Sequence, residues 1–295
     1  MSIASRPSDV ELVVLDLDGG ERLERCLASI AAQQAAVARV VVWDNGSESP
    51  VADRLQGRSF PFELSIARSA ENLGFTGGVN AAIALCSAPF VGLVNNDVEL
   101  DPRWIATLRP MFDGAPRLAA VQGIIATPEG LIDGAGVDVS DGTIRQALHG
   151  SEAERAASAL EPWGVSATAA LYRADALHDV AAEGDLLRAE LFAWYEDVEL
   201  SARLRARGWS VALNRAILAT HAGSATAHRL GGHRLYLQTR NRYIVARAWP
   251  GTGRLGALLV EDLKKLARAM AALDLAASVA IIRAVVAGLL RSSTS

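Results

Sequence analysis

The chain has 295 residues, of which 51% are hydrophobic, and a formal net charge of −4, which allows one large α/β domain or one domain with an appendage. No stretch reaches the ~18 uncharged apolar residues of a membrane-spanning helix, and the first residues lack the apolar segment of a signal peptide, so we expect neither. Two cysteines, Cys26 and Cys86, indicate a reducing compartment without a disulfide framework, and we therefore expect a cytoplasmic protein.

The charge is unevenly distributed along the chain. Residues 229–295 contain 11 Lys and Arg against 3 Asp and Glu, a balance of +8, whereas residues 1–228 contain 18 against 30, a balance of −12. We therefore expect an acidic domain over 1–228 and a basic C-terminal extension over 229–295. Two interpretations are open for the basic residues: they form a solvated helix face, or they contact an anionic surface such as a membrane or a lipid-phosphate substrate.

Strand and helix patterns alternate between residues 10 and 126. Apolar, β-branched runs predict buried strands, and apolar residues at helical spacing predict the helices between them. The expected strands cover 10–17, 38–47, 62–69, 89–97 and 118–126. The expected helices cover 19–33, 76–87 and 102–112. This alternation predicts an α/β fold with a mostly parallel sheet and helices on both faces.

The pattern changes after residue 126. Glycines at short intervals over 130–150 predict a hairpin, and 162–177 is typical of a strand that runs into a helix. Residues 229–290 are expected to be nearly all helical. Five leucines mark an apolar stripe in this segment: Leu255, Leu258, Leu259, Leu263 and Leu266.

Polar residues follow the second and fourth expected strands at their carboxyl ends, where such sheets bind ligands. Asp44 closes the second strand and precedes a turn of Asn45, Gly46 and Ser47. Two interpretations are open for Asp44: its carboxylate caps the turn or the next helix, or it accepts the imide N–H of uracil or thymine.

Asp97 closes the fourth strand, in VNNDVELDP. A carboxylate there, beside Asn95 and Asn96, is suited to holding a hard cation that bridges a diphosphate. The alternative role, a helix N-cap, already fits Asp101 before Pro102, which leaves Asp97 for something else.

The segment ENLGFTGGVNAAI, residues 71–83, places glycines before a helix. No Gly-Lys-Ser/Thr follows, so it is not a P-loop, and the spacing is not the Gly-x-Gly-x-x-Gly of a dinucleotide site. The segment either packs a helix tightly onto the sheet or presents a helix N-terminus to a diphosphate.

Glu196 and Asp197 follow a run of aromatic residues and begin a basic helix, EDVELSARLRARGW. A helix N-terminus favours negative charge by about 0.3–1 kcal/mol, which accounts for the pair in isolation. A carboxylate in a cleft is also suited to general-base catalysis. The rest of the chain has to decide between these two interpretations.

The order of the segments is more specific than any one of them. DNGS, NLGFTGGVN, NNDVEL, YEDVELSARLRARGW and THAGSAT follow one another along the chain. This series closely resembles glycosyltransferase family 2, and within it the bacterial rhamnosyltransferase-like enzymes, over about residues 10–250. The resemblance implies the GT-A fold, a Rossmann-like mixed sheet flanked by helices, for 1–228, ahead of the C-terminal helical extension.

The resemblance implies which residues bind the donor. Asp44 would hold the pyrimidine base of a nucleotide-sugar. The other donor contacts would come from residues that shape or border the same pocket: Asn72, Gly74, Asn95, Asn96 and, in RNRYIV, Arg242.

The same resemblance implies a metal site and a catalytic pair. Asp97 and His221 would hold Mn²⁺ or Mg²⁺ on the diphosphate, and one carboxylate with one imidazole suits Mn²⁺ better. Asp197 would be the general base, and Glu196 would support it. Attack opposite the leaving group would invert the anomeric centre without a covalent glycosyl-enzyme.

These roles describe an inverting, metal-dependent glycosyltransferase. The resemblance implies a dTDP- or UDP-sugar donor carrying rhamnose or a hexose, and as acceptor a hydroxyl of a cell-surface glycan or a lipid-linked saccharide. The basic C-terminal helices would contact the inner face of the membrane, as in a peripheral protein, or a second copy in a homo-oligomer. We expect no nucleic-acid partner.

A second hypothesis is a catalytically weak or inactive protein of this fold that binds a sugar-nucleotide or a glycan. Asn95 stands where the family's Asp-x-Asp metal motif begins. The first strand ends in LDLDG, whose Asp16 and Asp18 would repel a diphosphate unless they face away or help to hold a cation. A nucleotidyltransferase is a poorer match, because no glycine-rich basic loop follows the first strand.

Overall fold

The computed structural model describes residues 8–223 and 225–290, and of residues 225–231 the backbone alone. The strands are β1 (Val10–Asp16), β2 (Arg39–Asp44), β3 (Glu63–Arg68), β4 (Phe90–Asn95), β5 (Val98–Leu100), β6 (Leu118–Ala126), β7 (Ile132–Gly134), β8 (Val137–Asp138), β9 (Arg145–Gln146), β10 (Ala169–Arg173) and β11 (Ser210–His221). The α-helices are α1 (Glu21–Ala31), α2 (Val51–Arg54), α3 (Gly74–Ile83), α4 (Trp104–Leu108), α5 (Ala174–Ala181), α6 (Glu196–Ala206), α7 (Ala225–Ala248), α8 (Leu255–Ala271) and α9 (Leu275–Leu290).

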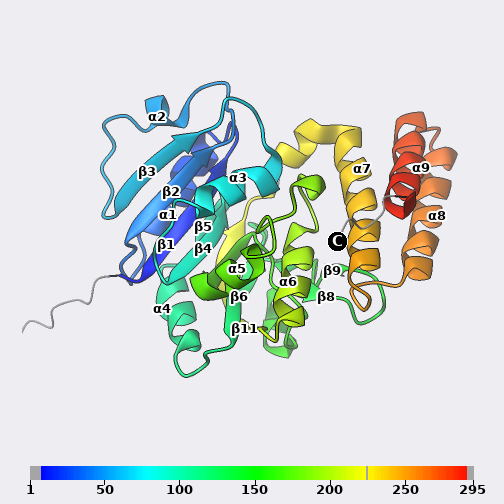
Figure 1. Ribbon diagram of the computed structural model, residues 1–295. Helices are drawn as coiled ribbons and strands as arrows, with labels where there is room; N and C mark the ends of the chain where they lie inside the picture. Colours follow the sequence, from blue (N-terminus) through cyan, green and yellow to red (C-terminus); the bar gives the residue numbers. More distant parts are fainter. Residues whose placement is uncertain (1–7, 224, 291–295) are drawn as a thin grey trace, which may run out of the picture.

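One mixed sheet carries the strand order β3-β2-β1-β4-β10-β6-β11-β5, with β7 paired to β6 (Figure 1). β3, β2, β1 and β4 are parallel, as the alternation of strands and helices predicts. β10 is antiparallel to both of its neighbours, and β5 is antiparallel to β11. The sheet is therefore the mixed α/β sheet that the family resemblance implies, and only its first half is parallel throughout.

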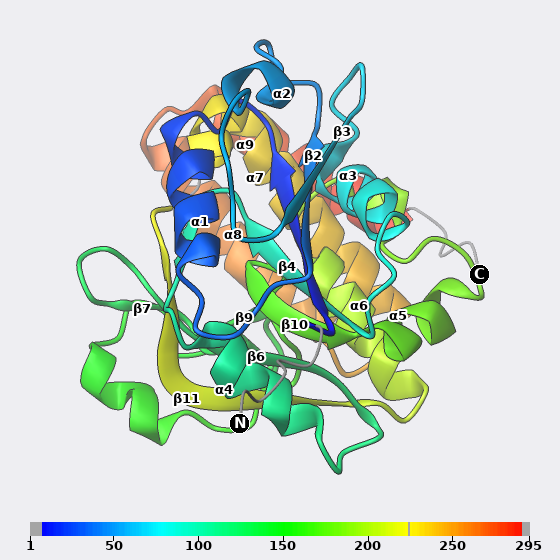
Figure 2. The same cartoon turned by 90° about the vertical axis from the view of Figure 1, so that its left-hand side faces the viewer.

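Helices pack against both faces of this sheet through apolar side chains. Along β1, Leu12 and Val14 point to one face and Val13 points to the other, which is the period of two expected of a strand. Helices α1 and α4 pack on the first face, and α3, α5 and α6 pack on the second (Figure 2). Because β1, β2 and β4 are parallel, their carboxyl ends lie at the same edge of the sheet, where the predicted polar residues lie.

The connections after β6 follow the sequence analysis. β8 and β9 form an antiparallel hairpin inside the segment 130–150, and β10 runs directly into α5 inside 162–177. β7, β5 and the short helix α2 were not predicted. Each is at most four residues long, which is too short for a hydrophobic period to show.

The longest strand, β11, also has no counterpart among the predicted elements. Its pairing with β6 shifts register between Asn214 and Ile217 and again before Ala219. Such bulges disrupt the alternation of buried and exposed residues by which a strand is recognised. The strand nevertheless decides the position of His221, which pairs with Val98 of β5 at the far end of β11.

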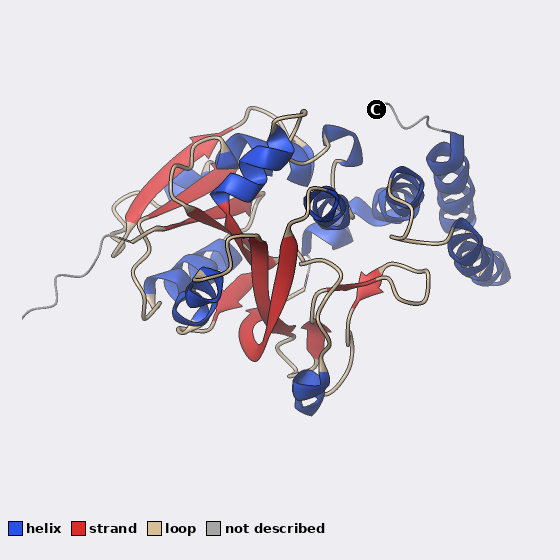
Figure 3. Cartoon of the chain, turned by 60° about the horizontal axis from the view of Figure 1, so that its bottom comes forward, coloured by secondary structure: helices blue, strands red, loops and turns tan. Residues whose placement is uncertain are grey.

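Helices α7, α8 and α9 form the predicted C-terminal extension, at the end of the molecule opposite to β3 (Figure 3). The boundary predicted between residues 228 and 229 falls inside α7, which begins at Ala225. Residues 291–295 of the predicted extension lie outside the described part of the chain. α9 packs closely on α7, because a Cβ on Gly288 would lie 2.7 Å from the Cβ of Tyr243.

A buried ion pair joins α7 to α8. Arg242, only 4% exposed, pairs with Asp262, and its guanidinium also donates to Glu261 at 2.6 Å. The hydroxyl of Tyr243 donates to the second oxygen of Asp262 at 2.8 Å. This network satisfies the buried carboxylate and fixes the angle between the two helices.

The apolar stripe predicted along the C-terminal segment faces the solvent for the most part. Leu258 is buried, whereas Leu255, Leu259 and Leu263 are 39–55% exposed. None of the described helices combines the length and the hydropathy that crossing a membrane requires.

Candidate active site

A cleft of about 360 Å³ opens at the edge of the sheet where β1, β2 and β4 end. Eight of the ten predicted site residues line it: Asn72, Gly74, Asn95, Asn96, Asp97, Glu196, Asp197 and His221. Asp44 and Arg242 do not. Segments that are far apart in the sequence thus meet around one cavity, as the order of the motifs predicts.

Asp97 and His221 are brought together by the pairing of β5 with β11. The Nε2 atom of His221 lies 3.3 Å from Oδ1 of Asp97, without the geometry of a hydrogen bond. On its other side, Nδ1 of His221 lies 2.9 Å from Oδ2 of Asp133, a residue of β7 that the sequence analysis did not single out. Burial alone would lower the pKa of His221. The hydrogen bond to Asp133 and the neighbouring Asp97 outweigh burial and raise this pKa to about 9.

Asp97 and His221 are suited to hold a divalent cation whose remaining ligands are substrate oxygens. Nε2 of His221 is buried and has no hydrogen-bond partner, although it faces a carboxylate. A buried nitrogen in this position is suited to metal ligation, with Asp133 fixing the ring from behind. Among the described residues no group of three or more His, Cys, Asp and Glu forms a metal site. Asp97 and His221 would contribute ligands from the chain, and oxygens of a bound diphosphate would contribute others.

Glu196 is buried and Asp197 is half-buried at the first turn of α6, in the wall of the cleft. Burial raises the pKa of both carboxyl groups, and the charge of Asp197 raises the pKa of Glu196 further. Hydrogen bonds from the N–H groups of Val198 and Ala167 and from the Ser166 hydroxyl hold the pKa of Asp197 below that of Glu196. Oε2 of Glu196 has no hydrogen-bond partner. The two carboxyl groups therefore titrate as a pair, in which the hydrogen bonds make Asp197 the stronger acid.

The loop before α6 has an unusual backbone. Phe192, Trp194 and Tyr195 have φ angles of 63°, 67° and 69°, in the left-handed region, which is rare for aromatic residues. Each such residue costs about 1–2 kcal/mol, so the loop needs compensating contacts.

Asn241 of α7 supplies these contacts. It is fully buried, and its Nδ2 lies 2.8, 2.8 and 2.9 Å from the carbonyl oxygens of Leu191, Ala193 and Trp194. Arg240 donates to Oδ1 of Asn241 at 2.9 Å, which fixes the amide with its N–H groups toward the loop. The RNRYIV segment thus holds the backbone that precedes the acidic pair, and this role was not predicted.

The glycine segment packs α3 against the same loop. The N–H of Thr76 donates to the Phe192 carbonyl at 3.1 Å, and the N–H of Gly74 donates to Oδ1 of Asn72 at 2.8 Å. Gly74 has a φ of 74°, and a Cβ there would lie 2.5 Å from the Phe192 ring. Because two N–H groups of the first turn already have partners, the structure favours the packing interpretation over a helix end open to a diphosphate.

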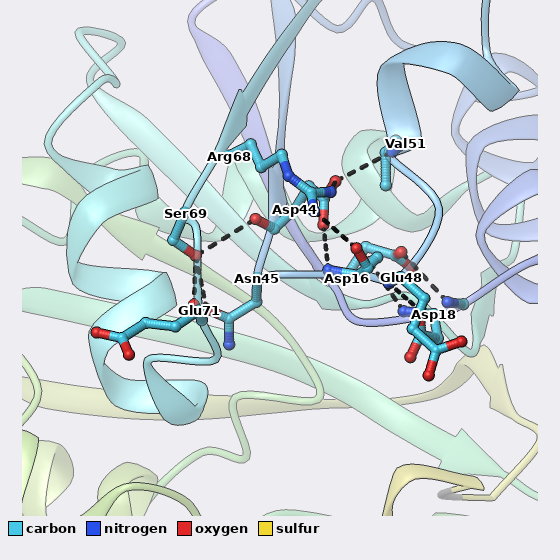
Figure 4. A network of polar contacts seen from close by, with 11 residues as sticks. Asp16, Asp18, Asp44, Asn45, Glu48, Val51, Arg68, Ser69 and Glu71 are labelled. Carbon is cyan, nitrogen blue, oxygen red and sulfur yellow. Dashed lines mark hydrogen bonds and ion pairs between the residues drawn. The ribbon is translucent and has the colours of Figure 1, made fainter.

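The sequence left two roles open for Asp44, a cap and a contact to a pyrimidine base, and the structure shows the cap. Its carboxylate accepts the N–H groups of Ser47 at 2.8 Å and Val51 at 3.0 Å, and it pairs with Arg68 (Figure 4). Burial would raise the pKa of Asp44, but these hydrogen bonds outweigh burial and lower it. The neighbouring Asn45 lines the cleft instead and donates to Asn72 Oδ1 at 3.0 Å. The DNGS turn therefore reaches the cleft through its second residue.

The carboxylates of the LDLDG loop do not line the cleft. Asp16 is buried and accepts the side-chain N–H of Asn96 at 2.6 Å and the N–H of Gly19 at 3.2 Å. Burial raises the pKa of Asp16 despite these hydrogen bonds. Asp18 accepts the N–H of Glu48 at 2.8 Å (Figure 4). Both carboxylates are thus engaged outside the cleft lining, so their repulsion of a diphosphate is no argument for an inactive protein.

A family model covers the part of the chain that contributes Asn72, Gly74 and Asp97 to this site. The model of glycosyl transferase family 2 matches residues 18–181, more than half of the chain. The chain belongs to this family. No curated protein sequence matches it.

Solved structures share the fold of this family 2 chain at low sequence identity. The mannosyltransferase PcManGT from Pyrobaculum calidifontis, in complex with GDP-Man and Mn²⁺, is 15% identical with a TM-score of 0.60, over 98% of this chain and 90% of that one. S. aureus TarS 1-349 is 16% identical with a TM-score of 0.55, over 80% of this chain and 64% of that one. The chain thus spans less than two thirds of the TarS fragment. These likenesses confirm the predicted GT-A fold.

We expect Glu196→Gln to stabilise the family 2 chain more as the pH rises. The folded-state pKa of Glu196 lies above its unfolded value, so the folded protein binds this proton more tightly and loses stability as pH increases through that pKa. Glutamine cannot ionise, and it removes about 1.4 kcal/mol of this loss for each unit of pKa shift. Urea unfolding at pH 5, 7 and 9 measures the difference. The exposed Glu21→Gln is the control, and a pH-independent effect of Glu196→Gln would contradict the prediction.

We expect Asn241→Leu to loosen the loop that carries the acidic pair. The substitution leaves buried carbonyls without donors, at about 1–3 kcal/mol for each unsatisfied group. Amides of residues 190–197 should exchange with deuterium at least tenfold faster, as about 1.4 kcal/mol corresponds to a factor of ten. Thr239→Val, a buried neighbour on α7, is the matched control. Equal exchange in both variants would show that Asn241 does not hold the loop.

Proposed function

We propose that this chain is an inverting glycosyltransferase that moves a sugar from a nucleoside-diphosphate donor to an acceptor hydroxyl. One observation carries the proposal: the Asp97–His221 pair and the Glu196–Asp197 pair line the same cleft of about 360 Å³. Glycosyl transfer requires the leaving diphosphate and the base for the acceptor hydroxyl to lie around the same sugar, and the two pairs provide this arrangement. TarS 1-349 in complex with UDP-GlcNAc and PcManGT in complex with GDP-Man and Mn²⁺ support a nucleotide-sugar donor.

Asp97 and His221 would hold the cation, which we propose to be Mn²⁺ or Mg²⁺. When bound, the cation would neutralise charge that develops on the diphosphate. Asp133 keeps the His221 ring in place through its hydrogen bond to Nδ1. The mixed carboxylate and imidazole set favours Mn²⁺, as does the Mn²⁺ complex of PcManGT.

Asp197 would accept the proton of the acceptor hydroxyl. The hydroxyl oxygen forms a bond to the anomeric carbon while the bond from that carbon to the diphosphate breaks, and the nucleoside diphosphate leaves with the electron pair. The raised pKa of Asp197 brings it closer to neutral pH, where a base is most effective. Glu196 would support Asp197: the raised pKa of Glu196 disfavours a second negative charge beside the base.

The donor and acceptor follow the family resemblance. We propose a UDP- or dTDP-sugar, with rhamnose or a hexose as the sugar, and the UDP-GlcNAc complex of TarS supports the uridine alternative. The proposed acceptor is a hydroxyl of a cell-surface glycan or of a lipid-linked saccharide. Cys26 and Cys86 are free thiols, which supports a cytoplasmic location.

Asp197→Asn is expected to abolish transfer while nucleotide-sugar binding persists. An amide cannot take up the acceptor proton, so kcat should fall by at least about 10²–10⁴-fold. Product formation from UDP-sugars and dTDP-sugars and calorimetric titration of the same donors separate the two effects. Asp175→Asn, an exposed acid in the first turn of α5, is the control. Turnover that survives in Asp197→Asn would remove the base assignment.

Asp97→Ala is expected to remove the Mn²⁺-dependent part of donor affinity. Titration of UDP with and without Mn²⁺ should show a gain in affinity for the native chain and a gain smaller by roughly 10–100-fold for the variant. Asp113→Ala, at an exposed carboxylate, should retain the full gain. Full activity of Asp97→Ala in chelator would contradict a metal-assisted reaction. Donor binding without transfer in the native chain would support the alternative, a non-catalytic binding protein.

A further inference from the structure

The exposed apolar side chains of this protein are concentrated on α8, α9 and the turn between them. Fifteen large hydrophobic residues are exposed in the described part of the chain, and only Leu73, Leu85 and Leu160 lie outside residues 255–290. The other twelve are Leu255, Leu259, Val260, Leu263, Met270, Leu273, Leu275, Val279, Ile282, Val286, Leu289 and Leu290. Monomeric soluble domains rarely expose apolar side chains in such a contiguous group, which therefore indicates an interaction surface.

Helix α9 has two apolar faces, only one of which is covered. The buried face of α9 packs on α7. It consists of small or β-branched residues: Ser278, Ile281, Ala284 and Gly288. The opposite face carries residues that are 38–79% exposed at alternating intervals of four and three: Leu275, Val279, Ile282, Val286 and Leu289. A helix that is apolar all round is normally buried on all sides, so a second apolar phase is expected against this face.

Helix α8 adds apolar and cationic side chains beside that face. Leu259, Leu263 and Met270 are 40%, 55% and 61% exposed on one side of the helix. Exposed cations lie on both helices: Lys264, Lys265, Arg268 and Arg283. Lys264 and Arg268 continue the i, i+4 row that begins with the exposed Val260, and Arg283 follows Ile282 at the border of the exposed face of α9. This arrangement combines an apolar stripe with positive charge at its border.

The acids on these two helices are engaged locally. Asp262 is buried against Arg242, and Glu261 pairs with the same guanidinium. Asp274 accepts the N–H of Ala277 at the start of α9. The surface of α8 and α9 is thus cationic, although residues 1–228 carry a balance of −12.

We propose that the exposed face of α8 and α9 docks on an anionic membrane surface. Insertion of the apolar stripe buries it in the interfacial region, and the flanking cations meet anionic headgroups. The acidic body is repelled by the same headgroups, which orients the molecule with α8 and α9 against the lipid. A twofold contact between two copies would instead bring the same cations of both chains together.

The helices lie along the surface in this arrangement rather than across it. α9 has 16 residues, fewer than the ~20 that cross a bilayer. No described helix meets the requirements of a membrane span. The contact is therefore reversible and depends on the anionic lipid content and on ionic strength.

Co-sedimentation with vesicles tests the proposal on the full chain. We expect binding to vesicles of phosphatidylcholine mixed with phosphatidylglycerol, and weak binding to pure phosphatidylcholine. Replacing Lys264, Arg268 and Arg283 by Gln should reduce the affinity roughly 100-fold, because each cation near the surface contributes about 1 kcal/mol. Equal binding to both vesicle types would overturn the role of the charges.

A second variant tests the apolar stripe. The triple substitution Val279→Asp, Ile282→Asp and Val286→Asp should abolish vesicle binding, whereas Leu160→Asp, at a residue 81% exposed outside the extension, should not change it. UDP titration of each variant separates this proposal from the proposed function, because donor binding should be unaltered. A stable dimer by light scattering that the triple substitution dissociates, without vesicle binding by the native chain, would overturn membrane docking in favour of a second copy.

Discussion

One side-chain amide carries the geometry on which the cleft depends. The carbonyl groups of Leu191, Ala193 and Trp194 all point at Nδ2 of Asn241. That contact offsets the cost of a backbone with three aromatic residues in the left-handed region. A loop in ordinary extended conformation would start α6 elsewhere and take its first two carboxylates out of the cleft. Strain at this point is thus coupled to the position of the residues that are best suited to chemistry.

The electrostatics of the cleft follow from burial on both of its sides. At Glu196 and Asp197 burial raises the pKa of both groups, and hydrogen bonds lower the pKa of Asp197 relative to that of Glu196. At His221 two carboxylates outweigh burial and raise the pKa. A donor diphosphate brings negative charge, which favours a cation on the side of His221 and disfavours a second charge on the acidic pair. The Asp97–His221 pair therefore suits the leaving diphosphate of the proposed reaction, and the Glu196–Asp197 pair suits a single base for the acceptor hydroxyl.

The sequence predicts the parts of this site that depend on local pattern. Asp97 follows a strand that the apolar pattern predicts, whereas the resemblance to the family, through the order of its motifs, singles out Asn72, Glu196 and Asp197; all four line the cleft. Asp133 and Asn241 were missed because their roles depend on partners that long-range pairing alone brings near. Asp133 meets His221 only through the irregular strand β11, and Asn241 meets the loop only because α7 packs against it. Arg242 was assigned to the donor site from its neighbourhood in the chain. Adjacent residues of a helix point to different sides, however, and the side chain of Arg242 points to α8.

This division of faces makes α7 the element that links the cleft to α8 and α9. Within six residues, Gln238 lines the cleft, Arg240 and Asn241 hold the strained loop, and Arg242 and Tyr243 hold Asp262 of α8. Gly288 of α9 packs against the same turn, because a Cβ there would lie 2.8 Å from the Arg240 carbonyl oxygen. A surface that binds α8 and α9 would consequently fix the direction in which the cleft opens. Orientation toward an acceptor would then come from rigid packing along less than two turns of one helix, without any conformational change in the cleft itself.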